Sequence, residues 1–106
     1  MSGWIDVCAV SEIPPGGRRT VDVDGAEALV VNVAGELMAV EDVCTHDGTP
    51  IAEGEIEDGV IICPRHGARF CLRTGEALCA PAYDPIATFE VRVHNDRVQV
   101  RDSRFD

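Results

Sequence analysis

The stretches Cys44-Thr45-His46-Asp47-Gly48 and Cys63-Pro64-Arg65-His66-Gly67 decide how this 106-residue chain folds. Each contains a cysteine followed by a histidine two or three residues later, and each reaches a glycine soon after, so the backbone can turn sharply. Each stretch supplies one soft thiolate and one imidazole, which is the ligand set of a binuclear iron–sulfur cluster whose two irons have different partners. The pattern therefore predicts an iron–sulfur centre held by Cys44, His46, Cys63 and His66.

A zinc site is the main alternative for a set of two cysteines and two histidines. Structural zinc sites usually place the two cysteines together and the two histidines together, in the spacing C-x2-4-C followed by H-x3-5-H. This chain instead mixes the two ligand types within each stretch. In an extended loop Cys44 and His46 point to the same side and can face one object. The spacing therefore favours an iron–sulfur cluster over zinc.

The two stretches resemble the cluster-binding motifs of Rieske [2Fe–2S] proteins, and the resemblance extends from Trp4 to about Val100. It implies an all-β, Rieske-like antiparallel β-sandwich with a small inserted cluster-binding subdomain, and one [2Fe–2S] cluster per chain. In this family two cysteines hold one iron and two histidines hold the other. By position, the resemblance implies that the inner iron is bound by Cys44 and Cys63 and the outer iron by His46 and His66.

Two departures from high-potential Rieske proteins are informative. Those proteins carry an extra cysteine in each motif, and the two form a disulfide, whereas Thr49 and Arg65 occupy these positions here. Those proteins also place a serine and a tyrosine after the second motif, whose hydroxyl groups donate hydrogen bonds to cluster sulfurs. The matching residues here are Ala68 and Phe70. Because hydrogen bonds to sulfur stabilise the reduced, more negative cluster, their loss predicts a low reduction potential.

This pattern resembles the small soluble Rieske ferredoxins of bacterial ring-hydroxylating dioxygenase systems. The resemblance implies a one-electron carrier, not an enzyme, that passes electrons from an NAD(P)H-dependent flavin reductase to a terminal oxygenase. Docking would be transient and would use the cluster tip, made of His46, Asp47, Gly48, Arg65, His66 and the loop at Pro81. Two alternatives stay open: a small Rieske subunit of another reductase, such as the nitrite reductase type, and a zinc-stabilised binding module.

Length and charge set further limits. A chain of 106 residues can bury one modest core, so we expect a single domain over residues 1–106. The net charge is −10, which argues against nucleic-acid binding because phosphate recognition needs a basic face, and which suits an encounter with basic patches on redox partners. No apolar run is long enough to span a membrane and no secretion signal is recognisable, so we expect a cytoplasmic protein.

Alternating apolar residues and turn signals predict strands along most of the chain. Residues 4–10, 21–23, 28–33, 37–41 and 60–62 fit strands, and the valines on both sides of Asn95-Asp96 fit a final hairpin. No segment of ten or more residues has helical periodicity. As the family implies, residues 1–42 and 81–106 should form the base, and residues 43–80 the cluster-binding subdomain.

Several other residues are expected to have structural or no roles. His94 is out of phase with the valines beside it and should face solvent. Tyr83 and Trp4 are expected to be packing residues. Asp22 and Asp102 are expected on the surface of the base. The remaining cysteines, Cys8, Cys71 and Cys79, are expected to be reduced and to act as small core residues.

Overall fold

A computed structural model describes residues 3–45 and 48–102 of the chain. Nearly all regular structure in this part of the chain is strand, and its one helical element is a 3-10 turn, η1, at Val10–Glu12. The all-β prediction is therefore confirmed. The strands are β1 (Ile5–Ala9), β2 (Arg18–Val23), β3 (Ala26–Val33), β4 (Glu36–Glu41), β5 (Ile56–Glu57), β6 (Val60–Ile62), β7 (Arg69–Cys71), β8 (Thr88–His94) and β9 (Arg97–Arg101).

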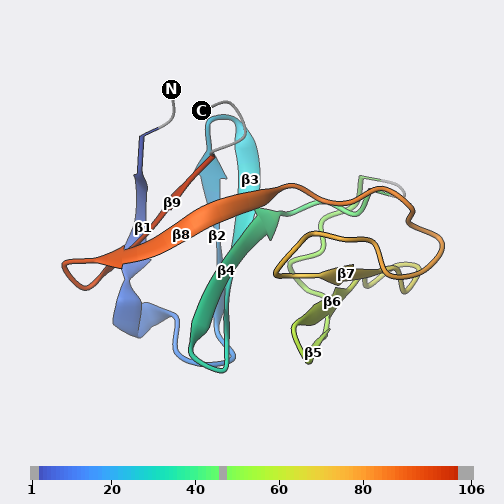
Figure 1. Cartoon of the computed structure of the whole chain (residues 1–106), viewed down its shortest axis with the longest axis horizontal. Coiled ribbons are helices and arrows are strands. Elements are labelled where there is room, and N and C mark those ends of the chain that lie inside the picture. Colours follow the sequence, from blue (N-terminus) through green and yellow to red (C-terminus); the bar gives the residue numbers. More distant parts are fainter. Residues whose placement is uncertain (1–2, 46–47, 103–106) are drawn as a thin grey trace.

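Six strands form one antiparallel sheet in the order β1-β9-β8-β4-β3-β2 (Figure 1). Strand β8 joins the two halves, because its first residues, Thr88 and Phe89, pair with β4 and the rest of the strand pairs with β9. The β8–β9 hairpin turns at Asn95 and Asp96, which both have positive φ angles. Such angles are those of the type I′ turn that best matches strand twist, so the predicted final hairpin is confirmed.

The large sheet has a hydrophobic core on each face of β3. A first core, here called the base core, receives residues from all six strands, among them Ala28 and Val30 of β3. Leu29 and Val31 of the same strand belong to a second core on the opposite face. Because successive side chains of a strand point to opposite faces, the continuous apolar run of β3 is buried on both sides.

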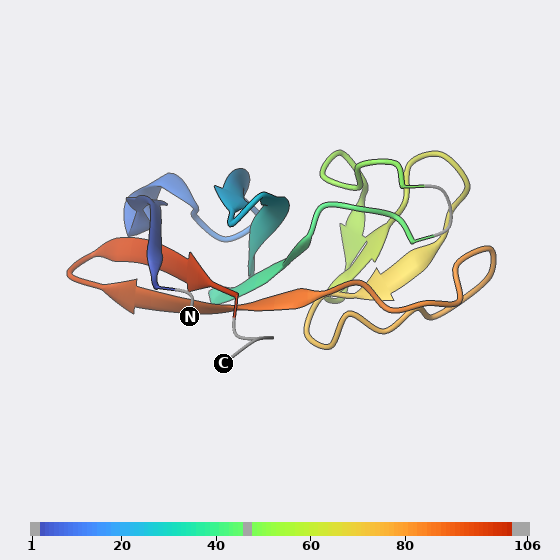
Figure 2. The ribbon, with the colours of Figure 1, turned by 90° about the horizontal axis from the view of Figure 1, so that it is seen from above.

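The second core joins the large sheet to a small antiparallel sheet with the order β5-β6-β7. It contains Ile61 and Phe70 from the small sheet and both motif cysteines, Cys44 and Cys63. In Figures 1 and 2 the small sheet lies at one end of the long axis and the β8–β9 hairpin lies at the other. The molecule measures 40 × 30 × 18 Å, so these two ends are well separated.

Two residues, Tyr83 and Asp102, differ in exposure from the expectation. Tyr83 is 82% exposed, so its assignment as a packing residue is wrong. Asp102 is 4% exposed and does not belong to the surface of the base. Trp4 is partly buried, with the Arg92 guanidinium 4.3 Å from its ring centroid, and His94 is exposed as predicted.

The three cysteines outside the motifs also differ from one another. Cys8 is buried in the base core, Cys71 is partly buried and Cys79 is exposed, so the expectation of core residues is wrong for Cys79. None of the five cysteines, all of which the structure describes, forms a disulfide. No helix in the described ranges is long and apolar enough to cross a membrane.

Candidate iron–sulfur cluster site

The two motif stretches form two loops at the ends of strands. The first loop, residues 43–49, follows β4 and contains Cys44. The second loop, residues 63–68, joins β6 to β7 and begins with Cys63. Both loops therefore start from a paired strand, which fixes the position of each cysteine.

The two loops share one hydrogen-bonding pattern. The amide of Cys44 donates to the carbonyl of Thr49 at 2.7 Å, and the amide of Gly48 donates back to the carbonyl of Cys44 at 2.7 Å. In the second loop, Cys63 and Gly67 make the same two bonds at 2.7 and 3.0 Å. Each glycine has a φ angle that other residues adopt only at a cost, +77° in the first loop and +76° in the second. The chain thus builds the same turn twice around its two motif cysteines.

The motif residues lie at different depths. Cys44 is 0% exposed and Cys63 is 1% exposed, and both belong to the second core. His66, three residues after Cys63, is exposed. This arrangement fits a binuclear centre with its thiolate side in the protein and its imidazole side towards solvent.

Two residues of the first motif lie outside the described part of the chain. They are His46, which was predicted to bind the outer iron, and Asp47, which was predicted to lie at the tip. Among the described residues, no three Cys, His, Asp or Glu side chains converge on the place of a single metal ion. Cys44, Cys63 and His66 are thus the three predicted ligands that the structure places.

The residues that pack behind the second loop are apolar. Ala68 and Phe70 are both 0% exposed and share the second core with the two cysteines. Neither side chain can donate a hydrogen bond. The predicted low reduction potential therefore depends on residues that are buried in the same core as the thiolates.

Arg18 of β2 connects the base to the segment that leads into the second loop. Its Nη1 group donates to the carbonyl oxygens of Ala52 at 2.7 Å and Gly54 at 2.6 Å. Sequence reasoning missed Arg18, because its partners are 34 and 36 residues away and no local pattern marks such a contact.

Asp42, which lies just before the first loop, makes a second set of hydrogen bonds to the same segment. Its Oδ1 atom accepts hydrogen bonds from the amides of Ile51 at 2.7 Å and Ala52 at 2.9 Å. Ala52 is thus bound by both side chains: its carbonyl accepts from Arg18 and its amide donates to Asp42. Residues 51–54 are consequently hydrogen-bonded both to β2 of the base and to the residue that precedes the first loop.

Replacing Arg18 with glutamine should lower the free energy of unfolding of the cluster-loaded protein by about 1–2 kcal/mol, because two carbonyl oxygens lose a charged donor. The matched control is Arg19→Gln. Arg19 pairs with Glu12 on the surface, where both side chains are more than 40% exposed, and such pairs contribute little. Chemical unfolding monitored by far-UV circular dichroism measures both variants; equal losses would contradict a special role for Arg18.

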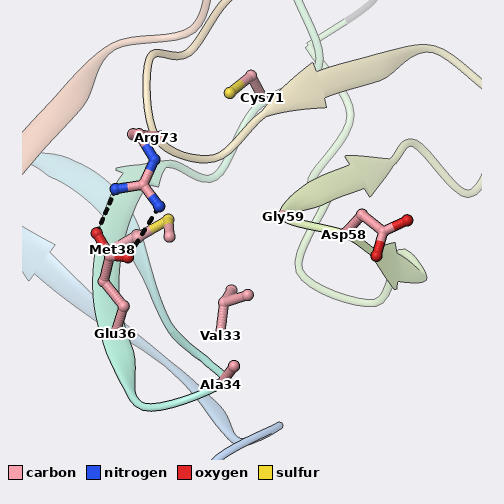
Figure 3. A pocket seen from close by; sticks show the side chains of 8 residues that line it. All are labelled: Val33, Ala34, Glu36, Met38, Asp58, Gly59, Cys71 and Arg73. Atoms are coloured by element: carbon pink, nitrogen blue, oxygen red, sulfur yellow. Dashed lines mark hydrogen bonds and ion pairs between the residues drawn. The ribbon is translucent and has the colours of Figure 1, made fainter.

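A groove of about 300 Å³ separates the β3–β4 hairpin from the small sheet (Figure 3). Arg73 and Glu36 point towards one another across it and form a two-pronged ion pair, with Nη2 to Oε1 at 2.8 Å. The hydrogen bond from Arg73 holds the pKa of the Glu36 carboxyl below its ordinary value. The contribution of this pair to stability is therefore present above the ordinary carboxyl pKa and is lost as the pH falls through the lowered one.

Cys71 also lines this groove. Hydrogen bonds from Thr74 lower the pKa of its thiol, and Arg73 lowers it further. The same lining contains two carboxylates: Glu36, which is paired with Arg73, and Asp58.

Comparison with known proteins decides the family. The family model for the Rieske [2Fe–2S] domain matches residues 3–90, which include both loops. The chain belongs to the Rieske [2Fe–2S] family. As a Rieske protein it carries one [2Fe–2S] cluster per chain, and the paired loops with their buried cysteines fit that group. The zinc alternative is not supported.

Individual relatives are similar over nearly their whole length. The ferredoxin subunit of a 3-phenylpropionate/cinnamic acid dioxygenase from Photorhabdus laumondii is 45% identical, over 89% of this chain and 90% of the relative. The ferredoxin component of a naphthalene 1,2-dioxygenase system from Pseudomonas aeruginosa is 40% identical, over 92% and 93%. A solved complex of reduced oxygenase and oxidised ferredoxin in carbazole 1,9a-dioxygenase matches with a TM-score of 0.87 and 38% identity, over 93% of both chains. The predicted Rieske fold is therefore confirmed.

Proposed function

We propose that this Rieske protein is the ferredoxin of a ring-hydroxylating dioxygenase system and carries single electrons from an NAD(P)H-dependent flavin reductase to a terminal oxygenase. The observation that carries the proposal is the pair of matching loops, with both cysteines buried and His66 exposed. The two relatives described above, which align with about nine-tenths of this chain, are named as ferredoxins of dioxygenase systems. The chain is thus a carrier and not a catalyst of substrate turnover.

The proposed ligand roles follow from depth and residue type. Cys44 and Cys63, buried in the second core, would hold the inner iron. His66, which is exposed, and His46 would hold the outer iron. When bound, the cluster supplies a centre that gains and loses one electron.

The residues around the cluster set where and how well it can exchange electrons. The second core excludes water from the cysteine side, and exposed His66 marks the side that a partner can approach. Electron transfer falls steeply with distance, so partners should dock at this side, the cluster tip. The net charge of −10 would draw the protein towards basic patches on both partners without holding the complex.

Three further assignments belong to the same proposal. The base would comprise residues 1–42 and 81–106, and the cluster-binding subdomain residues 43–80. This division is supported by the sheets, because the six-stranded sheet uses residues 5–41 and 88–101 and the small sheet uses residues 56–71. We place the protein in the cytoplasm, where the reductase has its nicotinamide cofactor.

Reconstituted turnover tests the proposed function. Cluster-loaded protein should contain about two irons and two acid-labile sulfides per chain, be brown and show a Rieske paramagnetic signal when reduced. It should also restore substrate hydroxylation when it replaces the native ferredoxin with the reductases and oxygenases of three systems: 3-phenylpropionate, naphthalene and carbazole dioxygenase. Failure in all three, by protein that is loaded and reducible, would contradict the proposed function.

A further inference from the structure

One loop beside the cluster carries exposed apolar side chains. Three large apolar residues in the described part of the chain are strongly exposed: Leu78 at 46%, Val93 at 51% and Tyr83 at 82%. Leu78 and Tyr83 lie in the segment after β7, residues 78–85, here called the third loop. Val93 lies in the β8–β9 hairpin at the other end of the molecule (Figures 1 and 2).

The third loop is attached to both cluster loops. Thr45, next to Cys44, donates a hydrogen bond from its hydroxyl group to the carbonyl of Asp84 at 2.7 Å. Cys79 contacts the second loop, with its Sγ 3.8 Å from the carbonyl oxygen of Gly67, the residue after His66. The third loop therefore lies directly beside the side of the molecule at which His66 is exposed.

The exposure of Tyr83 is imposed by the fold. Ala82, immediately before it, and Ile86, three residues after it, are 2% and 3% exposed and belong to the second core. The amide of Ile86 donates to the carbonyl of Gly75 at 2.8 Å, which holds the end of the loop. With Ala82 and Ile86 buried, the backbone between them is held against the second core and Tyr83 is directed outward.

We propose that Tyr83 is the docking anchor through which this protein binds the terminal oxygenase, with Leu78 completing the apolar contact. This inference rests on the proposed function. Tyrosine is enriched at the centres of protein interfaces because its ring offers a large, stiff apolar surface with a polar end. A tyrosine ring seated in a partner beside the cluster would set the orientation in which the His66 side meets its acceptor.

One observation favours the oxygenase over the reductase as the occupant. A ferredoxin that is 38% identical to this chain forms a complex with its oxygenase. In that relative the association of ferredoxin with oxygenase is therefore strong enough for the structure of the complex to be solved. The third loop also contains no basic residue and carries Asp84 beside Tyr83, in a chain of net charge −10. A complementary surface on the oxygenase would therefore be an apolar recess with basic side chains at its edge.

Binding by Tyr83 variants tests the anchor. Cluster-loaded wild type, Tyr83→Ala, Tyr83→Phe and Val93→Ala are titrated calorimetrically against whichever of the three oxygenases wild type serves in turnover. Tyr83→Ala should raise Kd roughly tenfold or more, whereas Tyr83→Phe, which keeps the ring, should stay within about threefold. Val93→Ala removes an exposed apolar group far from the tip and should leave Kd unchanged. The paramagnetic signal and reduction potential should be the same in all four proteins.

The possible results distinguish failure of the Tyr83 proposal from failure of the proposed function. If wild type serves an oxygenase and Tyr83→Ala binds it within twofold of wild type, the anchor is wrong and the proposed function stands. If Tyr83→Ala slows reduction by the reductase in stopped-flow measurements and leaves oxygenase binding unchanged, Tyr83 contacts the reductase and the proposed anchor for the oxygenase is wrong. If wild type serves none of the three oxygenases, the proposed function fails and the anchor fails with it.

Discussion

Replacing His66 with alanine should give a colourless protein with almost no iron. The structure places His66 at the exposed side of the second loop, three residues after buried Cys63, so its loss would leave the outer iron with one protein ligand. An iron–sulfur cluster that is open to water on one side is then released. His46→Ala should do the same. Iron and acid-labile sulfide analysis, together with the visible absorption spectrum, measures the loss.

Matched controls make this result specific to the ligands. His94→Ala removes an exposed histidine beside the β8–β9 turn and should leave the iron content unchanged. Cys79→Ser removes an exposed thiol near the second loop and should also keep the cluster, whereas Cys63→Ser should lose it or change its spectrum. Full cluster loading in His66→Ala would refute the assigned ligand set.

Much of the site could be predicted because its chemistry is local in sequence. Two short stretches carry all four proposed ligands, and both contain the glycines whose positive φ angles close the loops. Fold class was equally accessible, since apolar runs and alternation marked seven of the described strands and Asn95-Asp96 marked the last turn. β5 and β7 were not predicted, because two or three residues are too few for a periodic pattern.

The missed features depend on contacts between distant residues. Arg18 and Asp42 bind residues 51–54 through hydrogen bonds that no local sequence pattern predicts. Tyr83 was assigned to packing because a lone aromatic is most often buried, whereas its direction is set by Ala82 and Ile86 on either side. Tertiary context thus decided which side chains reach the surface beside the cluster, and this is where a partner would distinguish one Rieske ferredoxin from another.

The second large effect should be on the reduction potential. Rieske centres as a class span about −150 to +300 mV, and this protein should lie near the low end because Ala68 and Phe70 donate no hydrogen bonds to sulfur. Phe70→Tyr would add a hydroxyl group within the core that contains Cys44 and Cys63, where a buried donor needs an acceptor. A hydrogen bond to sulfur stabilises the reduced cluster, so the potential should rise, and Ala68→Ser should act in the same direction.

Phe89→Tyr is the control for this potential shift, because Phe89 is buried in the base core and not with the cysteines. It should leave the potential unchanged, which separates a hydrogen bond to sulfur from the general effect of a buried hydroxyl group. Redox titration followed by the paramagnetic signal measures all four proteins under one condition. A wild-type potential well above zero would show that the missing donors do not set it. A rise in Phe89→Tyr equal to that in Phe70→Tyr would show that proximity to the thiolates is not the cause. A selective rise in Phe70→Tyr would instead mean that the missing hydroxyl group at this buried position helps to keep the potential low.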